Sequence, residues 1–282
     1  MTIAPSNRRP LGTMVAYGFP DLAFADDLEL ARRLGASVLE IFPDWRRVPE
    51  PRPLRALVAA AGLAIHSAHG CWGGQTIRAE RVDLGLPDQE PRRESVEDLE
   101  RCIDWLAEAG GTCLVVHPGG LSDPSQTEAR RDALAGSLRL LAEHARGTGV
   151  ILCVENMPPG VHPGSRMADL FALVAELNEP AIALALDTGH AHISATVPSE
   201  THAAGRLLRT THVHDNNGRS DTHHPPGLGT IEWPEWAKAL DAIDYRGPII
   251  LECVRYLRKH PECLDVRLRR RLDRLTGEAA DT

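Results

Sequence analysis

The sequence has 282 residues, of which 43% are hydrophobic and 25% are charged. This composition is that of a globular protein, and a chain of this length buries enough surface to fold without disulfide bonds. The 39 acidic residues outnumber the 31 basic ones, a balance that disfavours a nucleic-acid partner. The six cysteines are scattered and form no CxxC pair, so they indicate free thiols in a reducing compartment.

The N-terminal stretch 1–12 is polar and lacks the apolar core of a signal peptide. No apolar run in the sequence approaches the length of a membrane-spanning helix. The sequence therefore predicts a cytoplasmic protein that has no membrane partner.

Short apolar runs alternate with segments of helical periodicity along the chain. The runs that predict strands are, in chain order, 12–17, 37–42, 63–69, 113–117, 150–155, 182–187, 210–214 and 248–252. The segments that predict helices between them are 26–34, 53–60, 95–109, 127–146, 167–177, 199–207 and 233–243. The basic stretch 267–274 predicts a further helix at the C-terminal end, with its charged face in solvent.

The third helical segment, 95–109, has recognisable signals at both ends. Ser95 is a suitable N-cap with Asp98 three residues later, and apolar residues then recur at helical spacing. The glycine pair Gly110 and Gly111 predicts the end of this helix.

Strict alternation of strand and helix predicts a parallel sheet, because parallel neighbours need a crossover connection. Eight such units in about 250 residues predict one α/β domain over 1–282, a parallel (β/α)8 barrel with a short C-terminal helical tail. The alternative is an open, doubly wound sheet. The residues after the first strand, 18–21, contain no GxGxxG phosphate-binding turn, which favours the barrel.

Potential metal ligands stand at the carboxyl ends of the predicted strands, where barrel enzymes carry their reacting groups. In chain order these strand-end residues are Glu40, His69, His117, Glu155, Asp187, His190, His212, His214 and Glu252. The long segment after the seventh strand adds Asp221, His223 and His224.

A single histidine or carboxylate at a strand end is most often a surface or hydrogen-bonded residue. Here many such residues converge at one barrel mouth, and this favours a metal site. Their charges, if unpaired, would cost several kcal/mol, and a bound cation would remove that cost. Histidine and carboxylate ligands suit Zn or Mn, and the lack of cysteine ligands argues against a structural zinc knot. Cys153 and Cys253 are interpreted as small apolar fillers.

Several motifs together resemble the xylose-isomerase-like barrel superfamily, which holds sugar isomerases and epimerases together with endonuclease IV. The motifs are SAHG, VVHPGG, VENMP, LDTGHAH, THVHDNNG, DTHHPPGLGTIEW and ILEC. The resemblance covers nearly the whole chain, most closely from the third strand to the eighth.

The ketose 3-epimerase branch implies one Mn or Co ion held by Glu155, Asp187, His212 and Glu252. In that branch the two glutamates also form the acid/base pair, and the position of His190 binds substrate. Its arginine after the strand-seven histidine has no direct match here, since Gly218 stands at that place and Arg219 follows it.

The endonuclease IV branch implies three zinc ions and nine ligands. Its ligand positions match His69, His117, Glu155, Asp187, His190, His212, Asp221, His223 and Glu252. The loop after Glu155 departs from the nuclease pattern, and the PPGLG and TIEW runs are closer to sugar isomerase relatives.

The sequence therefore favours a metal-dependent sugar or sugar-derivative isomerase or epimerase with a small carbohydrate as substrate. Glu155 and Glu252 would transfer protons on opposite faces of a metal-stabilised enediolate. The residues expected to bind the substrate or shape its pocket are His190, His69, His117, Glu40 and Arg219. The alternatives are a tri-zinc endonuclease for abasic DNA, a keto-sugar or inositol lyase or dehydratase, and a sugar-binding module. Assembly into a homo-oligomer is left open.

Overall fold

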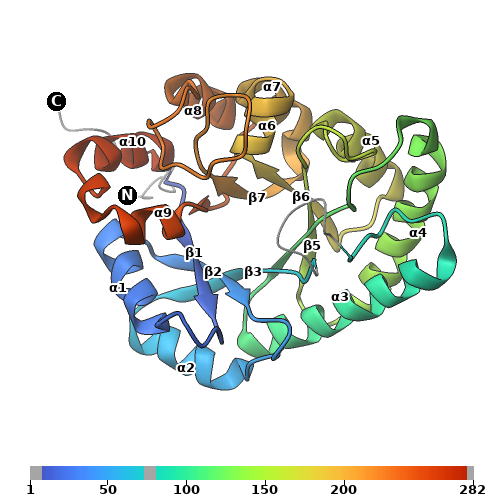
Figure 1. The fold of residues 1–282 in the computed structure, drawn as a ribbon, viewed down its shortest axis with the longest axis horizontal. Helices are drawn as coiled ribbons and strands as arrows, with labels where there is room; N and C mark the ends of the chain where they lie inside the picture. The colour runs from blue at the N-terminus through green and yellow to red at the C-terminus, as the bar shows by residue number, and fades with distance from the viewer. Residues whose placement is uncertain (1–7, 73–80, 278–282) are drawn as a thin grey trace, which may run out of the picture.

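The structure is a computed structural model and describes residues 8–72 and 81–277. Within these ranges eight parallel strands form a closed barrel in the order β1 to β8 (Figure 1). The strands are β1 Leu11–Tyr17, β2 Val38–Pro43, β3 Ala64–His69, β4 Cys113–Val116, β5 Ile151–Glu155, β6 Ile182–Asp187, β7 Leu208–Val213 and β8 Ile249–Leu251. The predicted fold class, a parallel (β/α)8 barrel, is confirmed.

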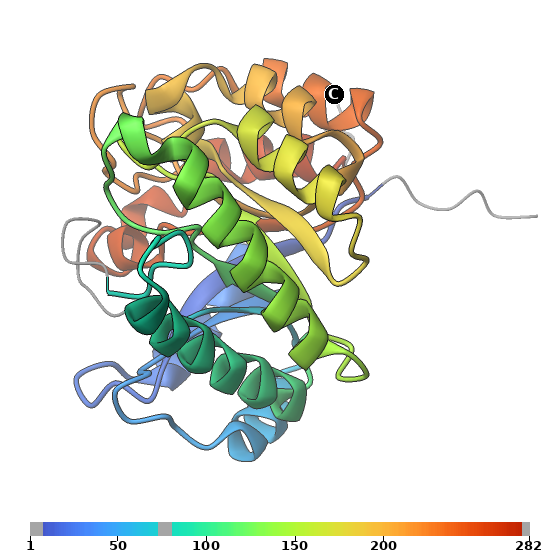
Figure 2. The ribbon, with the colours of Figure 1, turned by 90° about the vertical axis from the view of Figure 1, so that its right-hand side faces the viewer.

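Helices surround the barrel as an outer layer, and Figure 2 shows two of the longest, α3 and α4, side by side. The α-helices are α1 Phe24–Leu34, α2 Pro51–Ala60, α3 Gln89–Ala109, α4 Thr127–Ala145, α5 Met167–Leu177, α6 Thr188–Ser194, α7 Val197–Ala204, α8 Trp233–Ala242, α9 Val254–Lys259 and α10 Val266–Thr276. Short 3-10 turns lie at η2 Pro124–Gln126, η3 Gly205–Leu207 and η4 Pro261–Cys263.

Alternating side chains of each strand face the helices and the barrel interior. In β4, Leu114 and Val116 belong to the large core between barrel and helices, whereas Cys113 and Val115 belong to a small cluster inside the barrel. Cys153 of β5 joins that inner cluster, which fits its interpretation as a small apolar filler. The period of two thus fixes which strand-end side chains enter the barrel mouth.

The predicted start of α3 is wrong. The helix begins at Gln89, and the carboxylate of Asp88 caps it by accepting a hydrogen bond from the backbone N–H of Glu90. Pro91 does not break the helix because a proline in the first turn removes no helical hydrogen bond. Ser95 lies inside the helix, where its hydroxyl donates to the carbonyl of Pro91.

The basic C-terminal stretch forms α10, as predicted, and this helix is amphipathic. Leu268, Leu272 and Leu275 are buried on its inner face, and α10 packs on α8. The polar stretch 1–7, which bears on the prediction of no signal peptide, lies outside the described residues, as do the last residues, 278–282. Among the helices of the described ranges, none has the length and apolar character needed to cross a membrane.

Candidate metal centre

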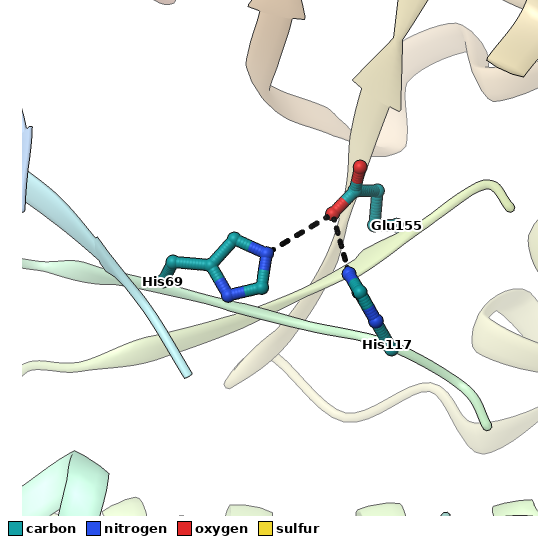
Figure 3. Close-up of side chains that lie close together, drawn as sticks. All are labelled: His69, His117 and Glu155. Atoms are coloured by element: carbon teal, nitrogen blue, oxygen red, sulfur yellow. Dashed lines mark ion pairs between the residues drawn. The ribbon is translucent and has the colours of Figure 1, made fainter. Parts of the chain in front are cut away.

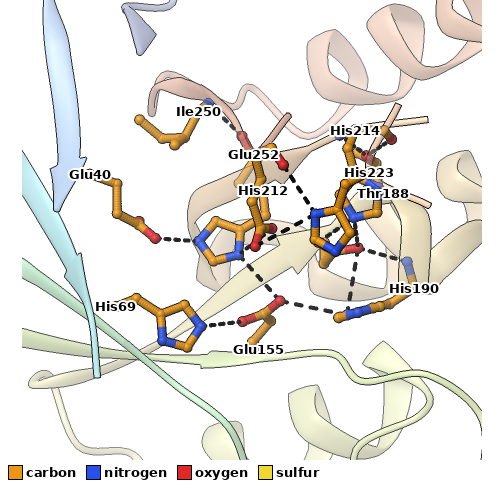
Figure 4. Close-up of polar contacts among 12 residues, drawn as sticks. Glu40, His69, Glu155, Thr188, His190, His212, His214, His223, Ile250 and Glu252 are labelled. Atoms are coloured by element: carbon orange, nitrogen blue, oxygen red, sulfur yellow. Dashed lines mark hydrogen bonds and ion pairs between the residues drawn. The ribbon is translucent and has the colours of Figure 1, made fainter. Parts of the chain in front are cut away.

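The inward-facing residues of several strands converge at the carboxyl end of the barrel. Glu155 and Asp187 end β5 and β6, and each stands two residues after an inner-cluster residue, Cys153 or Ala185. His212 lies on β7, and Glu252 follows directly after β8. The barrel therefore brings together side chains that are far apart in sequence (Figure 4).

The central group consists of Glu155, Asp187, His212 and Glu252. Each of them offers a ligand atom, and these atoms all lie within 4.8 Å of one another. Nδ1 of His212 is 3.2 Å from an oxygen of Glu155 and 3.2 Å from an oxygen of Glu252. These are the four residues that the sequence predicts as ligands of one ion.

A second group, His69, His117 and Glu155, adjoins the central one (Figure 3). Oε2 of Glu155 is 3.8 Å from Nε2 of His69 and 3.5 Å from Nε2 of His117. The other carboxylate oxygen, Oε1, faces His212. Glu155 therefore joins the two groups, one oxygen to each.

The third group is His214, Asp221 and His223. Asp221 lies 3.0 Å from Nε2 of His223, 3.5 Å from Nε2 of His214 and 3.4 Å from Nε2 of His190. The rings of His214 and His223 stack with their centroids 4.0 Å apart. The sequence predicts an outer group of His190, Asp221 and His223 and lists His214 only among the strand-end candidates. In the structure His214 belongs to this group, and His190 lies beside it.

The spacing along β7 explains why His214, one of the strand-end candidates, faces the same site as His212. Residues two apart on a strand face the same way, and His214 stands two residues after His212. Nε2 of His214 lies 3.0 Å from an oxygen of Asp187, and the carbonyl of His214 accepts a hydrogen bond from Thr188. A side chain at position 189 would collide with the His214 ring, because a Cβ there would lie 1.9 Å from it. Gly189 is therefore needed for this packing.

Hydrogen bonds to Asn156 and between the two residues hold Asp187 and His190 in place. The side chain of Asn156 accepts from the backbone N–H of Asp187 and donates to its carbonyl. The carboxylate of Asp187 accepts from the backbone N–H of His190 and so caps α6. Nδ1 of His190 is bonded to the carbonyl of Asn156, which turns Nε2 towards Asp221.

Two residues predicted to bind the substrate or shape its pocket, Glu40 and Arg219, belong to none of the three groups. Glu40 is 0% exposed, and its oxygens are bonded to Nε2 of His212 and to the hydroxyl of Ser67. Glu40 is therefore a buried hydrogen-bond partner of His212. Arg219 is exposed on the loop after β7, and within the described chain its side chain has no hydrogen bond or ion pair with the three groups. His224 turns its ring towards Tyr256.

The electrostatics of the carboxylates differ across the site. Burial by itself would raise the pKa of Glu155, but His212 and His117 hold that pKa well below its ordinary range. Burial raises the pKa of Glu252 to about 6, against the opposing effect of His212 and His223. Two nearby carboxyl groups with different pKa values are suited to different proton-transfer roles.

The histidines differ as well. Burial would lower the pKa of His212, but the carboxylates of Glu40, Glu155 and Glu252 raise it well above the ordinary value. In contrast, burial and the neighbouring His117 lower the pKa of His69 to about 4. His69 is therefore neutral near pH 7, the state in which an imidazole binds a metal.

The residues of the site fit a divalent cation. Within the described chain, Oε2 of Glu155 and Nδ1 of His214 are buried and lack a hydrogen-bond partner, a costly state for a polar atom. A cation would satisfy Glu155 and would balance carboxylates that otherwise repel each other. The mixture of imidazole and carboxylate donors suits Mn, Co or Zn.

The protein is thus a closed parallel barrel with candidate metal sites at the carboxyl ends of its strands. The chain belongs to the family described as xylose isomerase-like TIM barrel, whose model matches residues 28–273.

Curated relatives with different names are similar to this chain. A fructoselysine 3-epimerase from Shigella flexneri is 29% identical over 184 residues, which are 64% of this chain and 66% of that protein. The chain thus spans just under two thirds of that relative. A probable endonuclease 4 from Mycobacterium marinum is 27% identical over 83% of this chain and 91% of its own length. A 3-dehydro-D-guloside 4-epimerase from Escherichia coli is 24% identical over 71% of this chain and 75% of its own length.

Among solved structures, a D-tagatose 3-epimerase-like protein superposes with a TM-score of 0.78 at 22% identity, over 96% of this chain and 100% of the other. The apo form of 3-keto-D-glucoside 4-epimerase from E. coli superposes with a TM-score of 0.73 at 22% identity, over 91% of this chain and 99% of that chain. At these identities the likeness concerns the fold.

Proposed function

We propose that this chain is a metal-dependent epimerase or isomerase of a sugar or sugar derivative. The observation that carries the proposal is the central group, in which Glu155 and Glu252 both lie 3.2 Å from Nδ1 of His212. Two carboxylates beside one imidazole are the groups that a two-base proton transfer around a metal needs. The relatives named as sugar epimerases support the same choice.

In this proposal Glu155, Asp187, His212 and Glu252 hold the metal. When bound, the metal supplies positive charge that stabilises an enediolate developing on the substrate. One glutamate removes a proton from the carbon next to the carbonyl, and the other returns a proton to the opposite face. Isomerisation would instead return the proton to the neighbouring carbon.

The surroundings of the two glutamates favour different roles. The Glu155 side chain is 2% exposed and the Glu252 side chain 17%, so Glu252 is the more open to an incoming substrate. The pKa of Glu252, about 6, is close to neutral pH, as suits a group that both accepts and donates a proton. We assign the first proton abstraction to Glu155, because its lowered pKa keeps it ionised as a base must be, and the return to Glu252, because its higher pKa lets it hold the proton that it donates.

His190, His69 and His117 complete the proposed pocket. The His69 and His190 side chains are 7% and 9% exposed, and the His117 side chain is 12% exposed. We infer that their ring nitrogens orient substrate hydroxyl groups. A lyase or dehydratase that acts on a keto-sugar or inositol derivative would begin with the same proton abstraction.

A second candidate, an endonuclease for abasic DNA, is favoured by one specific observation. All nine residues that match the nuclease pattern lie in or beside the three candidate groups. The acidic balance of the chain argues against it, since a nuclease grips phosphates with basic side chains. The two buried arginines of the described chain, Arg9 and Arg130, already form ion pairs with Asp241 and Asp83, so their charges are not free for a phosphate.

The test compares both chemistries on the same metal-loaded protein. We expect deuterium from D2O to enter keto-sugars of a substrate panel, and no incision of a duplex that contains an abasic site. Glu155→Gln and Glu252→Gln should each reduce exchange by about 100-fold or more, the range for loss of a general acid or base.

The matched control is Glu94→Gln, an exposed glutamate of α3, which should leave exchange unchanged. Elemental analysis gives a second readout, with one metal per chain expected. Efficient incision that disappears in Glu155→Ala, together with three zinc ions per chain, would overturn the sugar proposal in favour of the nuclease.

A further inference from the structure

Glu40 occupies a place in the barrel that a carboxylate rarely takes. It lies on β2, its side chain enters the barrel, and it is 0% exposed. The register between β2 and β3 shifts between Leu39 and Glu40, and this irregularity sets Glu40 opposite Ser67. Such irregularities in barrels redirect side chains next to functional sites.

Each oxygen of Glu40 has a separate partner. Oε1 lies 2.6 Å from Nε2 of His212, across the barrel (Figure 4). Oε2 accepts a hydrogen bond from the hydroxyl of Ser67 at 2.6 Å. The Ser67 bond fixes the carboxylate, so that Oε1 is held in line with the imidazole.

The two nitrogens of His212 therefore have different partners. Nε2 points to Glu40, whereas Nδ1 points to Glu155 and Glu252. An imidazole binds a metal through a nitrogen without a proton, and a carboxylate at the other nitrogen keeps the remaining proton there. With Glu40 on Nε2, the nitrogen free for a metal is Nδ1, which faces the central group.

We propose that Glu40 is a positioning residue that orients His212 and holds its proton on Nε2, so that Nδ1 is the metal ligand. This inference rests on the metal site of the proposed function, but it is independent of which substrate that site handles. Glu40 contacts neither substrate nor metal. It acts through the His212 ring.

The burial of a carboxylate this deep in the barrel requires an explanation such as this positioning role. Removing a charge from water is costly unless strong partners replace the solvent. The partners of Glu40 are one hydroxyl and the His212 ring, with the small apolar cluster of Cys113, Val115 and Cys153 also inside the barrel. A neutral side chain would pack there at a lower cost, so packing alone does not account for a glutamate.

The experiment titrates metal-stripped protein with CoCl2 and follows the d–d absorption of Co²⁺. Glu40→Ala should weaken Co²⁺ affinity about 10- to 100-fold, the range for loss of a carboxylate that supports a metal-bound histidine. Glu40→Gln keeps an acceptor for Nε2 and loses only the charge, so its affinity should lie between that of Glu40→Ala and wild type.

Two control variants separate orientation from general loss of structure. Ser67→Ala removes the other hydrogen bond of the same carboxylate and should change affinity far less than Glu40→Ala. Asp27→Asn alters another carboxylate that is 0% exposed, one paired with Arg258 and bonded to the backbone of Ala16. It should lower thermal stability and leave Co²⁺ affinity unchanged.

A spectroscopic readout reports on the proton itself. In the zinc-loaded protein with ¹⁵N-labelled histidine, we expect a slowly exchanging Nε2 proton on His212 that is lost in Glu40→Ala. Wild-type affinity in a folded Glu40→Ala, or an unchanged His212 proton signal, would overturn the inference. If wild type itself binds no Co²⁺, the proposed metal function fails instead.

Discussion

At the scale of single residues, protons and a metal compete for the same nitrogens. Burial would lower the pKa of His190, but Asp187 and Asp221 raise it to about 9. Burial likewise opposes the charge on His223, whose pKa is raised to about 10 by Glu252 and Asp221. The pKa of His212 is raised as well. These imidazoles therefore carry protons near pH 7 in the metal-free protein.

Metal affinity should consequently rise with pH. A histidine with a raised pKa keeps its proton up to that pKa, so a metal must displace the proton at every lower pH. Below pH 6 the proton of Glu252 competes too, since the pKa of that carboxyl is about 6. We expect Co²⁺ affinity to increase about tenfold per pH unit for each proton displaced, between pH 6 and pH 8.

Calorimetric titrations in two buffers of different ionisation enthalpy measure the number of protons released. An affinity that is flat across this pH range would contradict the idea that protonated His212 blocks the central group.

At the scale of elements, the segment between β7 and α8 depends on one buried carboxylate. Asp215 is 0% exposed, and its Oδ1 accepts from the backbone N–H groups of Asn216 and Ile231. Its Oδ2 accepts from the N–H of Gly227 and from the indole of Trp233. This segment also carries Asp221 and His223 of the third group, so Asp215 fixes their position from outside the site.

Asp215→Asn should loosen this segment. An amide offers one acceptor oxygen where the carboxylate has two, and leaves buried donors without a partner at a cost of about 1–3 kcal/mol in the free energy of unfolding. Urea unfolding measures that loss, and hydrogen exchange should quicken over 216–232. The comparison is Asp265→Asn, the exposed N-cap of α10, which should leave exchange of 216–232 unaltered. Unchanged exchange there in Asp215→Asn would contradict the anchoring role.

At the scale of the whole molecule, the central group ties together four consecutive strands. Its ligands lie on β5, β6 and β7 and directly after β8, and the strands pair in that order around the barrel. A cation bound there would bind the folded barrel and not the unfolded chain, in which these residues are far apart. Metal binding and stability of the barrel should therefore be linked.

We expect the metal-loaded protein to unfold at a higher temperature than the metal-free one. At a free metal concentration 100 times the Kd, the gain should be about 2.7 kcal/mol. Scanning calorimetry with and without EDTA measures it. The Glu155→Ala, Glu252→Ala double variant should show no gain. A gain of the same size in that variant would mean that the stabilising metal binds elsewhere.

Residues differ in how much of their structure the sequence reveals. The start of α3 was misplaced because Ser95 and Asp88 both suit an N-cap, and the choice depends on whether Pro91 fits in the first turn. The strand-end candidates were easier to recognise, since most of them end a strand of clear periodicity. The burial of Glu40 could not be predicted, because a strand-end position does not reveal depth, and its contact with His212 comes only from the tertiary structure.

The sequence by itself determined the alternation of strands and helices, and therefore the parallel barrel and the set of strand-end histidines and carboxylates. These follow from local periodicity, which nearby residues encode. The family resemblance implied the central group of four, but only the tertiary structure decided that His214 joins Asp221 and His223 and that Glu40 meets His212. Glu40 and His212 are 172 residues apart and meet because the barrel closes and because the β2–β3 register shifts at Glu40. Closure and register are set by packing among distant strands, and no short stretch of sequence contains that information.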